Sequence, residues 1–329
     1  MSVATELAPN RHTIEAIGSR ILEESSAKLP VSYIERLTGV QTVYHRNGHQ
    51  QASDLATAAA RTALDRADLR IADIDLLIFA SASQDLIEPA TSHIVAANLG
   101  ATDTPVMDVK NACNSFLNGI QVANAFIVAG LYRRILIVSG ETPSMAIRWA
   151  NKSKAQFMRS FPGFSMTDTG GAMVLAADRQ TAGVHAIEFR SDSAKWGVGT
   201  LGMGGSRAPR DLDATYFDMD GGKLHDAFLT LGPAILDATL DKTGRQWSDF
   251  AAIGMHQVSA PYLGTICRIL HVPESQIVRT IADYGNTTSC SLPLQLELSL
   301  ANKTVSEGDE FAFIGFGGGI SMGLGVFTL

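Results

Sequence analysis

Two hydrophobic patterns alternate along the chain, and together they predict an α/β fold. Residues 54–69, DLATAAARTALDRADL, carry alanine and leucine at helical spacing and lead into the buried-strand pattern of residues 73–83, DIDLLIFASAS. The same order returns later, where residues 224–244, LHDAFLTLGPAILDATLDKTG, predict a helix and residues 249–259, DFAAIGMHQVS, predict a strand. In both cases a short polar link joins the helix to a strand that ends in small polar residues.

A second pair of segments matches in the same order. Residues 105–130, PVMDVKNACNSFLNGIQVANAFIVAG, predict a strand, a polar turn and an apolar helix, followed by a strand at 133–141. Residues 280–309 predict the same plan, with the first strand at TIADY, and lead into a strand at 310–319. Two matching pairs in one order favour an internal duplication.

This repetition predicts two halves, residues 1–180 and residues 181–329, with the boundary inside DRQTAGVHAIEFRS. No low-complexity linker marks the boundary, so we expect the halves to pack tightly against each other. In such a duplicated fold, the turns that follow equivalent strands converge at the carboxyl ends of the sheets. Catalytic or binding residues are therefore expected in those turns.

The composition favours small-molecule chemistry. The chain has 329 residues, 46% of them hydrophobic, and its formal net charge of −7 gives no support for a nucleic-acid partner. Its three cysteines, Cys113, Cys267 and Cys290, lie far apart without a C-x-x-C pair, which argues against a disulfide framework and a zinc site. The chain shows no signal-peptide pattern, and no uncharged apolar run reaches the roughly 18 residues that span a bilayer. We therefore expect a soluble, cytoplasmic protein.

Cys113 lies in the polar turn of DVKNACNSFLNG, residues 108–119, between a predicted strand and an apolar helix. With Lys110 or Asn111 near the helix cap, the thiol would occupy the first turn and face free backbone N–H groups. That environment lowers the pKa of a thiol and favours the nucleophilic thiolate. The alternative is a small buried hydrophobe, because free cysteine is among the most buried residue types.

Two further polar residues follow predicted strands. His256 ends a strand in GMHQVSAP, and Asn286 lies in DYGNTTSCSLP ahead of an apolar helix. Alone, the histidine could be structural and the asparagine a cap or turn residue. The glycine run GFGGGISMG, residues 315–323, lets the backbone approach a ligand and offers N–H donors to an oxyanion. Together with Cys113, these features form a cysteine acyl-transfer site.

In this order, DVKNACNSF, HQVSAP, YGNTTSCSLP and FGGGISMG resemble the ketoacyl-ACP synthase III branch of the thiolase superfamily. The resemblance implies a five-layered αβαβα thiolase fold of two duplicated halves, a homodimer, and no metal or cofactor. It implies that Cys113 takes an acyl group from a thioester, while His256 and Asn286 stabilise the enolate or thioester oxygen of a second substrate. The backbone N–H groups of Cys113 and Gly318 would hold the tetrahedral oxyanion, and the other two cysteines would only pack.

Further segments match one subgroup of this branch. EPAT, NLG, SGET and HQVS are closer to the OleA-like enzymes of long-chain olefin synthesis and to relatives that form pyrones or dialkylresorcinols. Those enzymes join two acyl thioesters without decarboxylation, and the glutamate matching Glu88 is their base, supplied by the dimer mate. A base is needed because no CO2 is lost to generate the carbanion. Burial near the thioester would raise the pKa of Glu88. The interval from Glu88 to Cys113 is one residue shorter than in the olefin-type pattern.

Other positions depart from the ordinary synthase III pattern. Tyr33 and Leu37 stand where that pattern has a tryptophan and an arginine that hold CoA, and Pro261 and Tyr262 stand where an arginine follows HQVSA. These departures favour an acyl carrier protein over CoA as the donor, and a carrier protein requires a local basic face. The segment RWANKSKAQFMR is either such a face or a solvated lid, and its basic residues are Arg148, Lys152, Lys154 and Arg159.

The acyl chain is expected to contact Tyr33, Phe161, Phe164 and Met203, although core packing would also account for these side chains. Two other functions stay open. A decarboxylative synthase III that uses malonyl-ACP would not need Glu88, and an acyltransferase would hand its acyl group to an alcohol or amine. A non-catalytic subunit is disfavoured, because a scaffold has no chemical need for a cysteine, a histidine and an asparagine in this pattern.

Overall fold

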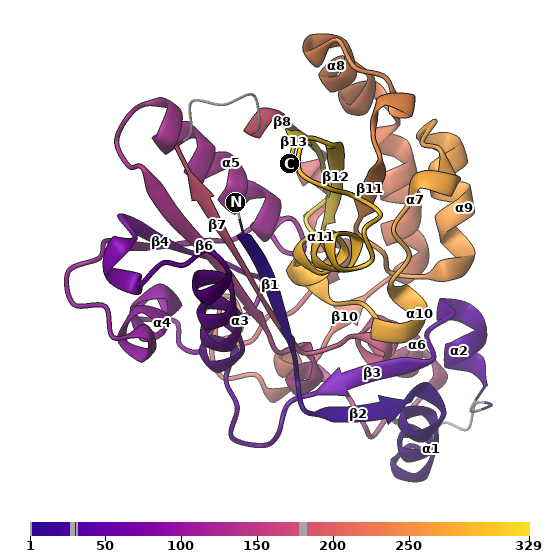
Figure 1. Ribbon diagram of the computed structural model, residues 1–329. Coiled ribbons are helices and arrows are strands. Elements are labelled where there is room, and N and C mark those ends of the chain that lie inside the picture. The colour runs from indigo at the N-terminus through magenta and orange to yellow at the C-terminus, as the bar shows by residue number, and fades with distance from the viewer. Residues whose placement is uncertain (1, 27–29, 31, 178–182) are drawn as a thin grey trace.

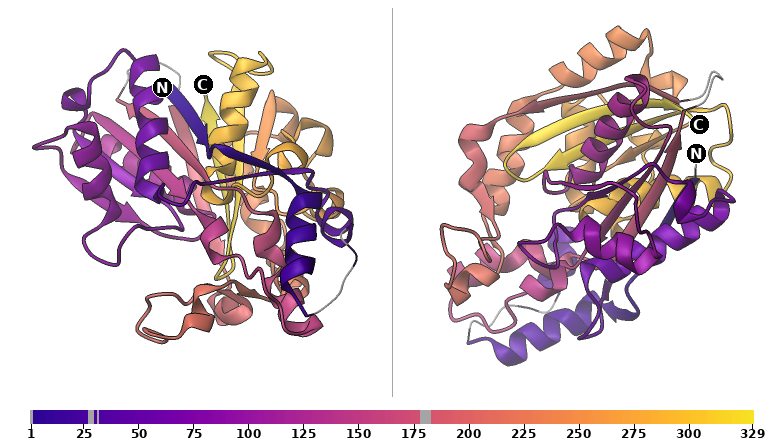
Figure 2. Two further views of the ribbon diagram at one scale, coloured as in Figure 1. Left: turned by 90° about the horizontal axis from the view of Figure 1, so that it is seen from below. Right: turned by 90° about the vertical axis from the view of Figure 1, so that its left-hand side faces the viewer.

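A computed structural model describes residues 2–26, 30, 32–177 and 183–329, and it contains two mixed β-sheets separated and flanked by helices (Figures 1 and 2). The strands of the first sheet are, in order, β1 (Ser2–Leu7), β7 (Thr169–Ala176), β6 (Arg134–Glu141), β4 (Leu76–Ala80) and β5 (Val106–Val109). The strands of the second sheet are, in order, β11 (Ala252–Met255), β12 (Glu310–Gly317), β13 (Ser321–Thr328) and β8 (Gly183–Ser191).

Three helix layers complete the five-layered αβαβα arrangement expected from the sequence. The layer outside the first sheet is α3 (Ala52–Arg66) and α4 (Thr91–Leu99). The layer between the sheets is α5 (Ser115–Val128) and α11 (Ser291–Ala301). The layer outside the second sheet is α7 (Gly221–Leu231), α8 (Ala234–Thr243) and α9 (Ala260–Ile269). None of the helices in the described part of the chain is long and apolar enough to cross a bilayer.

Smaller elements pack at one end of this core. β2 (Asn10–Thr13) pairs with β3 (Thr42–His45), and β9 (Gly199–Thr200) pairs with β10 (Asp218–Met219). The short helices there are α1 (Ile14–Glu24), α2 (Tyr33–Thr38), α6 (Lys154–Ser160) and α10 (Ile281–Tyr284), and they share one apolar cluster.

Strands in both sheets send alternate side chains into the helix layers on either side. In β4, Phe79 packs toward α3 and α4, whereas Ile78 packs toward α5. In β12, Phe313 joins the middle layer and Ile314 joins the outer one. Each large apolar side chain buried in this way contributes about 1.5–3 kcal/mol relative to exposure. Burial on both faces explains why these strands are continuous apolar runs in the sequence.

The strand directions repeat between the two sheets. β4 is parallel to β5 and β6, and β7 and β1 follow as antiparallel neighbours. β11 is parallel to β12, and β13 and β8 then follow as antiparallel neighbours. A parallel bridge joins Ile253 to Ile277 at the position that β5 occupies in the first sheet. The repeated plan is confirmed by this order. The expected boundary at residue 180 falls within 178–182, outside the described residues.

Two predicted elements were wrong in detail. The helix predicted over 224–244 is two helices, α7 and α8, that separate at Gly232 and Pro233. Gly232 has a φ of 64°, and Pro233 cannot donate the hydrogen bond that would continue α7. The strand predicted at TIADY is instead the short helix α10, which ends at Gly285 with a φ of 65°.

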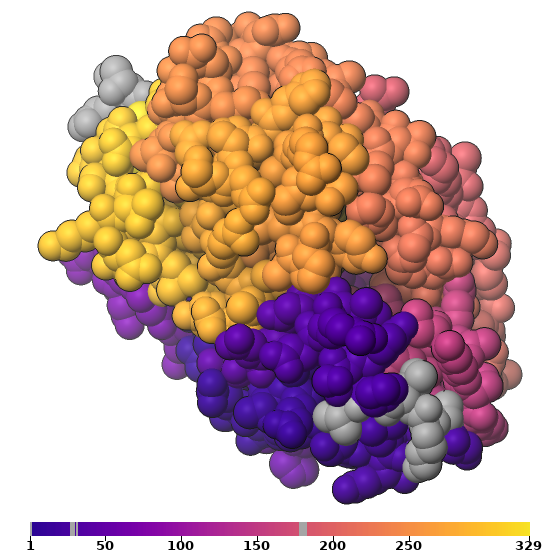
Figure 3. Space-filling view, turned by 90° about the vertical axis from the view of Figure 1, so that its right-hand side faces the viewer, coloured from indigo at the N-terminus to yellow at the C-terminus, as the bar shows by residue number. Residues whose placement is uncertain are grey.

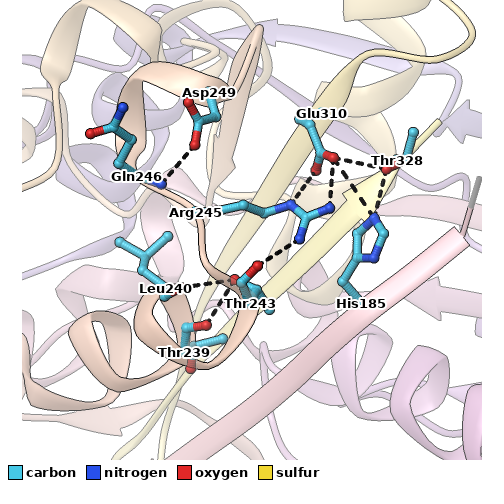
Figure 4. Close-up of polar contacts among 9 residues, drawn as sticks. All are labelled: His185, Thr239, Leu240, Thr243, Arg245, Gln246, Asp249, Glu310 and Thr328. Carbon is cyan, nitrogen blue, oxygen red and sulfur yellow. Dashed lines mark hydrogen bonds and ion pairs between the residues drawn. The ribbon is translucent and has the colours of Figure 1, made fainter.

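A polar cluster ties the end of α8 to the second sheet (Figure 4). The Arg245 guanidinium donates to both carboxylate oxygens of Glu310, with Nε–Oε2 at 2.9 Å and Nη2–Oε1 at 2.8 Å. Thr328 donates its hydroxyl to Glu310 at 3.0 Å and also contacts the ring of His185 on β8. The bidentate pair fixes the loop after α8 against β12, and the contacts of Thr328 with Glu310 and His185 link β12 to β13 and β8.

Helix α3 lies so close to β6 and β7 that two strand positions must be glycine. A Cβ at Gly140 would lie 1.8 Å from the Ala52 carbonyl oxygen, and a Cβ at Gly170 would lie 2.1 Å from that of Leu55. Both obstacles are backbone atoms, so a side-chain rotation cannot relieve the clash. The position of α3 over the first sheet therefore depends on these two glycines.

We expect Gly170→Ala to lower the free energy of unfolding by about 3 kcal/mol, because α3 must move away from β7. Urea denaturation would measure the change. Gly48→Ala is the matched control, since a Cβ there meets no atom within 4 Å. Equal stability of the two variants would contradict the close packing of α3.

Candidate active site

A cavity of about 760 Å³ brings together Cys113, His256 and Asn286 on its wall. These residues come from both halves of the chain and follow β5, β11 and α10 respectively. The remaining wall is mainly apolar and includes five methionines, Met145, Met158, Met166, Met203 and Met219. One border of the cavity is formed by Leu37 of α2, Leu224 of α7 and Tyr262 of α9. Figure 3 shows the side of the molecule where the violet N-terminal elements meet the orange surface of α9.

Cys113 precedes the N-terminus of α5 instead of occupying its first turn. The chain makes a tight turn in which the N–H groups of Asn114 and Ser115 donate to the carbonyls of Asn111 and Ala112, so the helix begins only at Ser115. Ala112 has a φ of 47°, a conformation that costs energy in a residue with a side chain. Burial and the nearby Glu141 raise the pKa of the Cys113 thiol to about 12. The expected lowering of this pKa by a helix terminus was therefore wrong.

The last two strands hold the turn of Cys113 in place. Asn114 donates its side-chain amide to the Ser321 hydroxyl at 2.8 Å and to the Ser321 carbonyl at 3.1 Å. A Cβ at Gly317 would lie 2.9 Å from the Asn111 carbonyl oxygen, so only glycine permits this approach. Gly318 also lies on the cavity wall, and a Cβ there would lie 3.7 Å from the Cβ of Ala112.

His256 is a buried, neutral imidazole. Burial lowers the pKa of His256 to about 4. Its Nδ1 lies 2.9 Å from the Ser291 hydroxyl, and that hydroxyl donates its single proton to the Thr288 carbonyl at 2.8 Å. Ser291 must therefore accept from Nδ1–H, which leaves the lone pair on Nε2. The resting ring can accept a proton at Nε2 but cannot donate one there.

Asn286 is held by backbone on both sides. Its N–H donates to the Ser165 carbonyl at 2.8 Å, and its carbonyl accepts from the N–H of Thr167 at 2.9 Å. The side-chain oxygen accepts from the N–H of Thr288 at 2.9 Å. The side-chain NH2 is then the group that Asn286 can offer to a substrate oxygen.

Comparisons with known proteins agree with this geometry. The family model "3-Oxoacyl-[acyl-carrier-protein (ACP)] synthase III" matches residues 107–193, and the model of its C-terminal part matches residues 240–329, so the two cover more than half of the chain. The chain belongs to this family. It is a condensing acyltransferase of the β-ketoacyl synthase III type.

Relatives and solved structures cover nearly the whole chain. A β-ketoacyl-ACP synthase III of Clostridium perfringens is 27% identical over 90% of each chain. The synthase III FabH of Pseudomonas aeruginosa is 26% identical, covers 99% of this chain and 96% of its own, and has a TM-score of 0.86. OleA of Xanthomonas campestris is 23% identical, covers 100% of this chain and 97% of its own, and has a TM-score of 0.89. The fold is the thiolase fold of these proteins.

Glu88, the base implied by the OleA-like segments, does not lie on the cavity wall of its own chain. It is exposed, in the loop before α4, and its neighbours Leu86 and Ile87 are 51% and 71% exposed. One chain thus brings Cys113, His256 and Asn286 together but leaves Glu88 outside.

The expected acyl contacts divide into two groups. Phe161 and Met203 lie on the cavity wall, but Phe164 is fully buried behind it in an aromatic cluster. Tyr33 packs against that cluster and does not line the cavity. Leu37, where ordinary members have a CoA-binding arginine, does lie on the wall.

The predicted basic face is partly neutralised. Arg148 pairs with Asp213 at 2.9 Å, and Arg159 pairs with Asp218, so both charges are largely balanced locally. Lys152 and Lys154 of the same segment remain exposed cations. The face is therefore less basic than the sequence suggests.

Glu141 is a cavity residue that the sequence reasoning did not assign. It ends β6 and is 1% exposed, although it is an acid. The signal was an acidic residue closing the otherwise apolar run RILIVSGE, which the motif SGET includes. Within the described residues, no cluster of histidine, cysteine and acidic side chains is arranged to hold a metal ion.

We expect the alkylation rate of Cys113 by iodoacetamide to rise about tenfold per pH unit from about pH 7 to pH 10. The rate follows the thiolate, which stays scarce over this range because the pKa of the thiol is about 12. Peptide mass mapping would separate Cys113 from Cys267 and Cys290. An ordinary thiol of pKa about 8.5 would level off above about pH 9, and such a plateau would contradict the environment described.

Proposed function

We propose that this enzyme joins two acyl thioesters by a non-decarboxylative Claisen condensation, with Glu88 of a second copy as the base. The observation that carries the proposal is the apolar cavity of about 760 Å³ with Cys113, His256 and Asn286 on its wall. A nucleophile on the wall of a large apolar cavity suits a long acyl chain. The product is a β-ketoacyl thioester, which can be passed on or cyclised to a pyrone or ring.

Acyl transfer to Cys113 comes first. His256 Nε2 takes the thiol proton as the sulfur attacks the carbonyl carbon of the donor thioester. The backbone N–H groups of Cys113 and Gly318 stabilise the tetrahedral oxyanion. The bond from the carbonyl carbon to the donor sulfur then breaks, and His256 Nε2 passes the proton from Cys113 to the departing sulfur, so that the donor leaves as a thiol and the ring is neutral again.

Condensation follows with the second thioester. The Asn286 amide donates to the thioester oxygen as the enolate forms, and the neutral His256 ring donates there in the tautomer with its proton on Nε2, in which the Ser291 hydroxyl donates to Nδ1. Glu88 removes the α-proton, the α-carbon attacks the Cys113 thioester, and the carbon–sulfur bond to Cys113 breaks. The Cys113 thiolate takes up one proton from water and Glu88 releases the α-proton to water, so the cycle gains and loses no net proton.

The position of Glu88 supports a homodimeric site. In one chain it lies outside the cavity, next to the exposed Leu86 and Ile87. Two apolar side chains so exposed beside a polar loop are typical of a surface that a partner covers. A second copy that covers this loop would receive Glu88 at its own Cys113.

Either CoA or an acyl carrier protein can deliver the substrates in this proposal. Leu37 lines the cavity where ordinary members have an arginine, and Tyr262 lines it close to where another arginine is missing. Each substitution removes a cation that would contact a phosphate of CoA, so a carrier protein is favoured as the acyl donor. The exposed Lys152 is the kind of contact that an acidic carrier would use.

Mass spectrometry of the products from purified enzyme and two saturated acyl thioesters would test the reaction. We expect a head-to-head β-keto product without any malonyl thioester, and at least a hundredfold loss in Glu88→Gln, because the amide cannot accept the α-proton. A product formed only with a malonyl thioester, with release of CO2 and unchanged in Glu88→Gln, would establish the decarboxylative alternative. The similarity to the β-ketoacyl-ACP synthase III of Clostridium perfringens favours that alternative. An ester or amide formed with an added alcohol or amine would establish the acyltransferase.

Delivery of Glu88 by a second copy has its own test. Co-expression of Cys113→Ala and Glu88→Gln chains with different tags allows the mixed dimer to be purified. We expect about half of the wild-type activity per dimer, since one of its two sites combines an intact Cys113 with an intact Glu88. The two homodimeric variants serve as inactive controls. An inactive mixed dimer would show that Glu88 does not act across an interface.

A further inference from the structure

Glu141 is a buried acid on the cavity wall with no role in the steps above. Its Oε1 accepts from the N–H of Ala82 at 2.8 Å and from the Ser289 hydroxyl. Its Oε2 accepts from the N–H of Ser83 at 3.1 Å and from the Ser83 hydroxyl at 2.8 Å. In the described part of the chain, no lysine, arginine or histidine forms an ion pair with it. Four donors thus converge on one carboxylate that no cation balances.

These donors join the two halves of the molecule. Ala82 and Ser83 follow β4 in the first half, whereas Ser289 lies in the second half, between Asn286 and α11. Ser289 has a further contact to the first half, because its hydroxyl lies 2.7 Å from that of Ser139 on β6. Strand β6 therefore holds Ser289 from two positions.

Ser289 belongs to the segment that orients both Asn286 and His256. Its neighbour Thr288 donates its N–H to the Asn286 side chain, and the Thr288 carbonyl accepts from Ser291, the hydrogen-bond partner of His256. Thr288 has a φ of 51°, which a residue with a β-branched side chain adopts only when its surroundings hold it there. The contacts made by Ser289 supply that restraint.

We propose that Glu141 is a positioning residue that holds the Asn286 and His256 segment opposite Cys113 through its contact with Ser289. The inference rests on the acyl transfer at Cys113 proposed above, but not on the kind of condensation that follows. An uncompensated buried charge is costly, so a carboxylate at this place has to contribute something that a neutral residue of the same size would not.

The charge of Glu141 also acts on the nucleophile. Burial first, and the Glu141 charge second, raise the pKa of Cys113. The resting thiol is therefore kept protonated until an acyl donor arrives and His256 accepts the proton. A purely structural contact would leave the ionisation of Cys113 unchanged, so the two roles can be separated by experiment.

Glu141→Gln removes the charge and turns one acceptor oxygen into a donor, which conflicts with one of the four donors that face it. We expect the iodoacetamide rate at Cys113 near pH 8 to rise about threefold or more, because the thiol pKa falls when the charge is lost. We expect kcat for condensation to fall about tenfold or more, because the Asn286 segment moves. Circular dichroism and a thermal melt would establish that the variant is folded.

Two further variants separate charge from position. Ser289→Ala keeps the charge and removes the link, so we expect a lower kcat with an alkylation profile equal to that of the wild type. Glu141→Asp keeps the charge on a shorter side chain, so the alkylation profile should again be retained while kcat falls. If Glu141→Gln does not fold, Ser289→Ala still decides the positioning role by its kcat.

Two results would overturn the inference. One is a wild-type kcat in Ser289→Ala, and the other is a folded Glu141→Gln with a wild-type kcat or an unchanged alkylation profile. Acyl-enzyme formation, read as a mass increase on Cys113 with a single acyl thioester, is measured in every variant. It is independent of malonyl thioester and of Glu88, so a failure of the proposed condensation would not be mistaken for a failure of this inference.

Discussion

The whole site depends on one close contact between the halves, in which the turn of Cys113 lies against the glycines of the last two strands. Asn114 binds Ser321 through its side-chain amide, and Gly317 lets the Asn111 carbonyl approach to a distance that no side chain would allow. This contact sets where the thiol lies relative to the backbone of Gly318. Because Ser321 and Gly317 of the last two strands hold the turn, Ala112 keeps a positive φ that it would avoid in an isolated peptide.

The electrostatics of the site follow from its burial. His256 is neutral, with its pKa lowered to about 4, and the thiol of Cys113 is also neutral, with its pKa raised to about 12. Two neutral groups in an apolar cavity gain little from exchanging a proton until a thioester carbonyl and its oxyanion donors are present. Among the residues that the structure describes, Glu141 is the one buried acid on the cavity wall, and four hydrogen-bond donors satisfy it. The resting enzyme is thereby protected from unspecific reaction of its nucleophile.

The duplicated architecture explains how such a site is assembled. Equivalent strands of the two sheets end on the same side of the molecule, so the first half supplies Cys113 and Glu141 while the second supplies His256 and Asn286. Ser289 connects the two sets through β6. A site built across two halves is sensitive to their relative position, which accounts for the density of hydrogen bonds around Thr288.

By itself, the sequence determined the α/β class, the repeated order of elements and the residues Cys113, His256 and Asn286, because apolar periodicity and polar turns are local properties of the chain. It also marked the glycine run at 315–323 as a place of close approach to a ligand, whereas the contact of Gly317 with the turn of Cys113 came only from the structure. The break between α7 and α8 was visible as Gly232–Pro233, but the apolar pattern on both sides masked it. The helix α10 has only four residues, too few to show a helical period, so its sequence by itself predicts a strand.

Only the tertiary structure decided the chemical state of these residues. The pKa of Cys113 rises because the fold buries the thiol and brings Glu141 near it, and no local pattern contains that information. The tautomer of His256 depends on Ser291, which is 35 positions away. Glu88 lies outside the cavity of its own chain for the same reason, since its place is set by how the loop before α4 packs on the sheet. Contacts between segments far apart in the chain cannot be read from the order of residues within each segment.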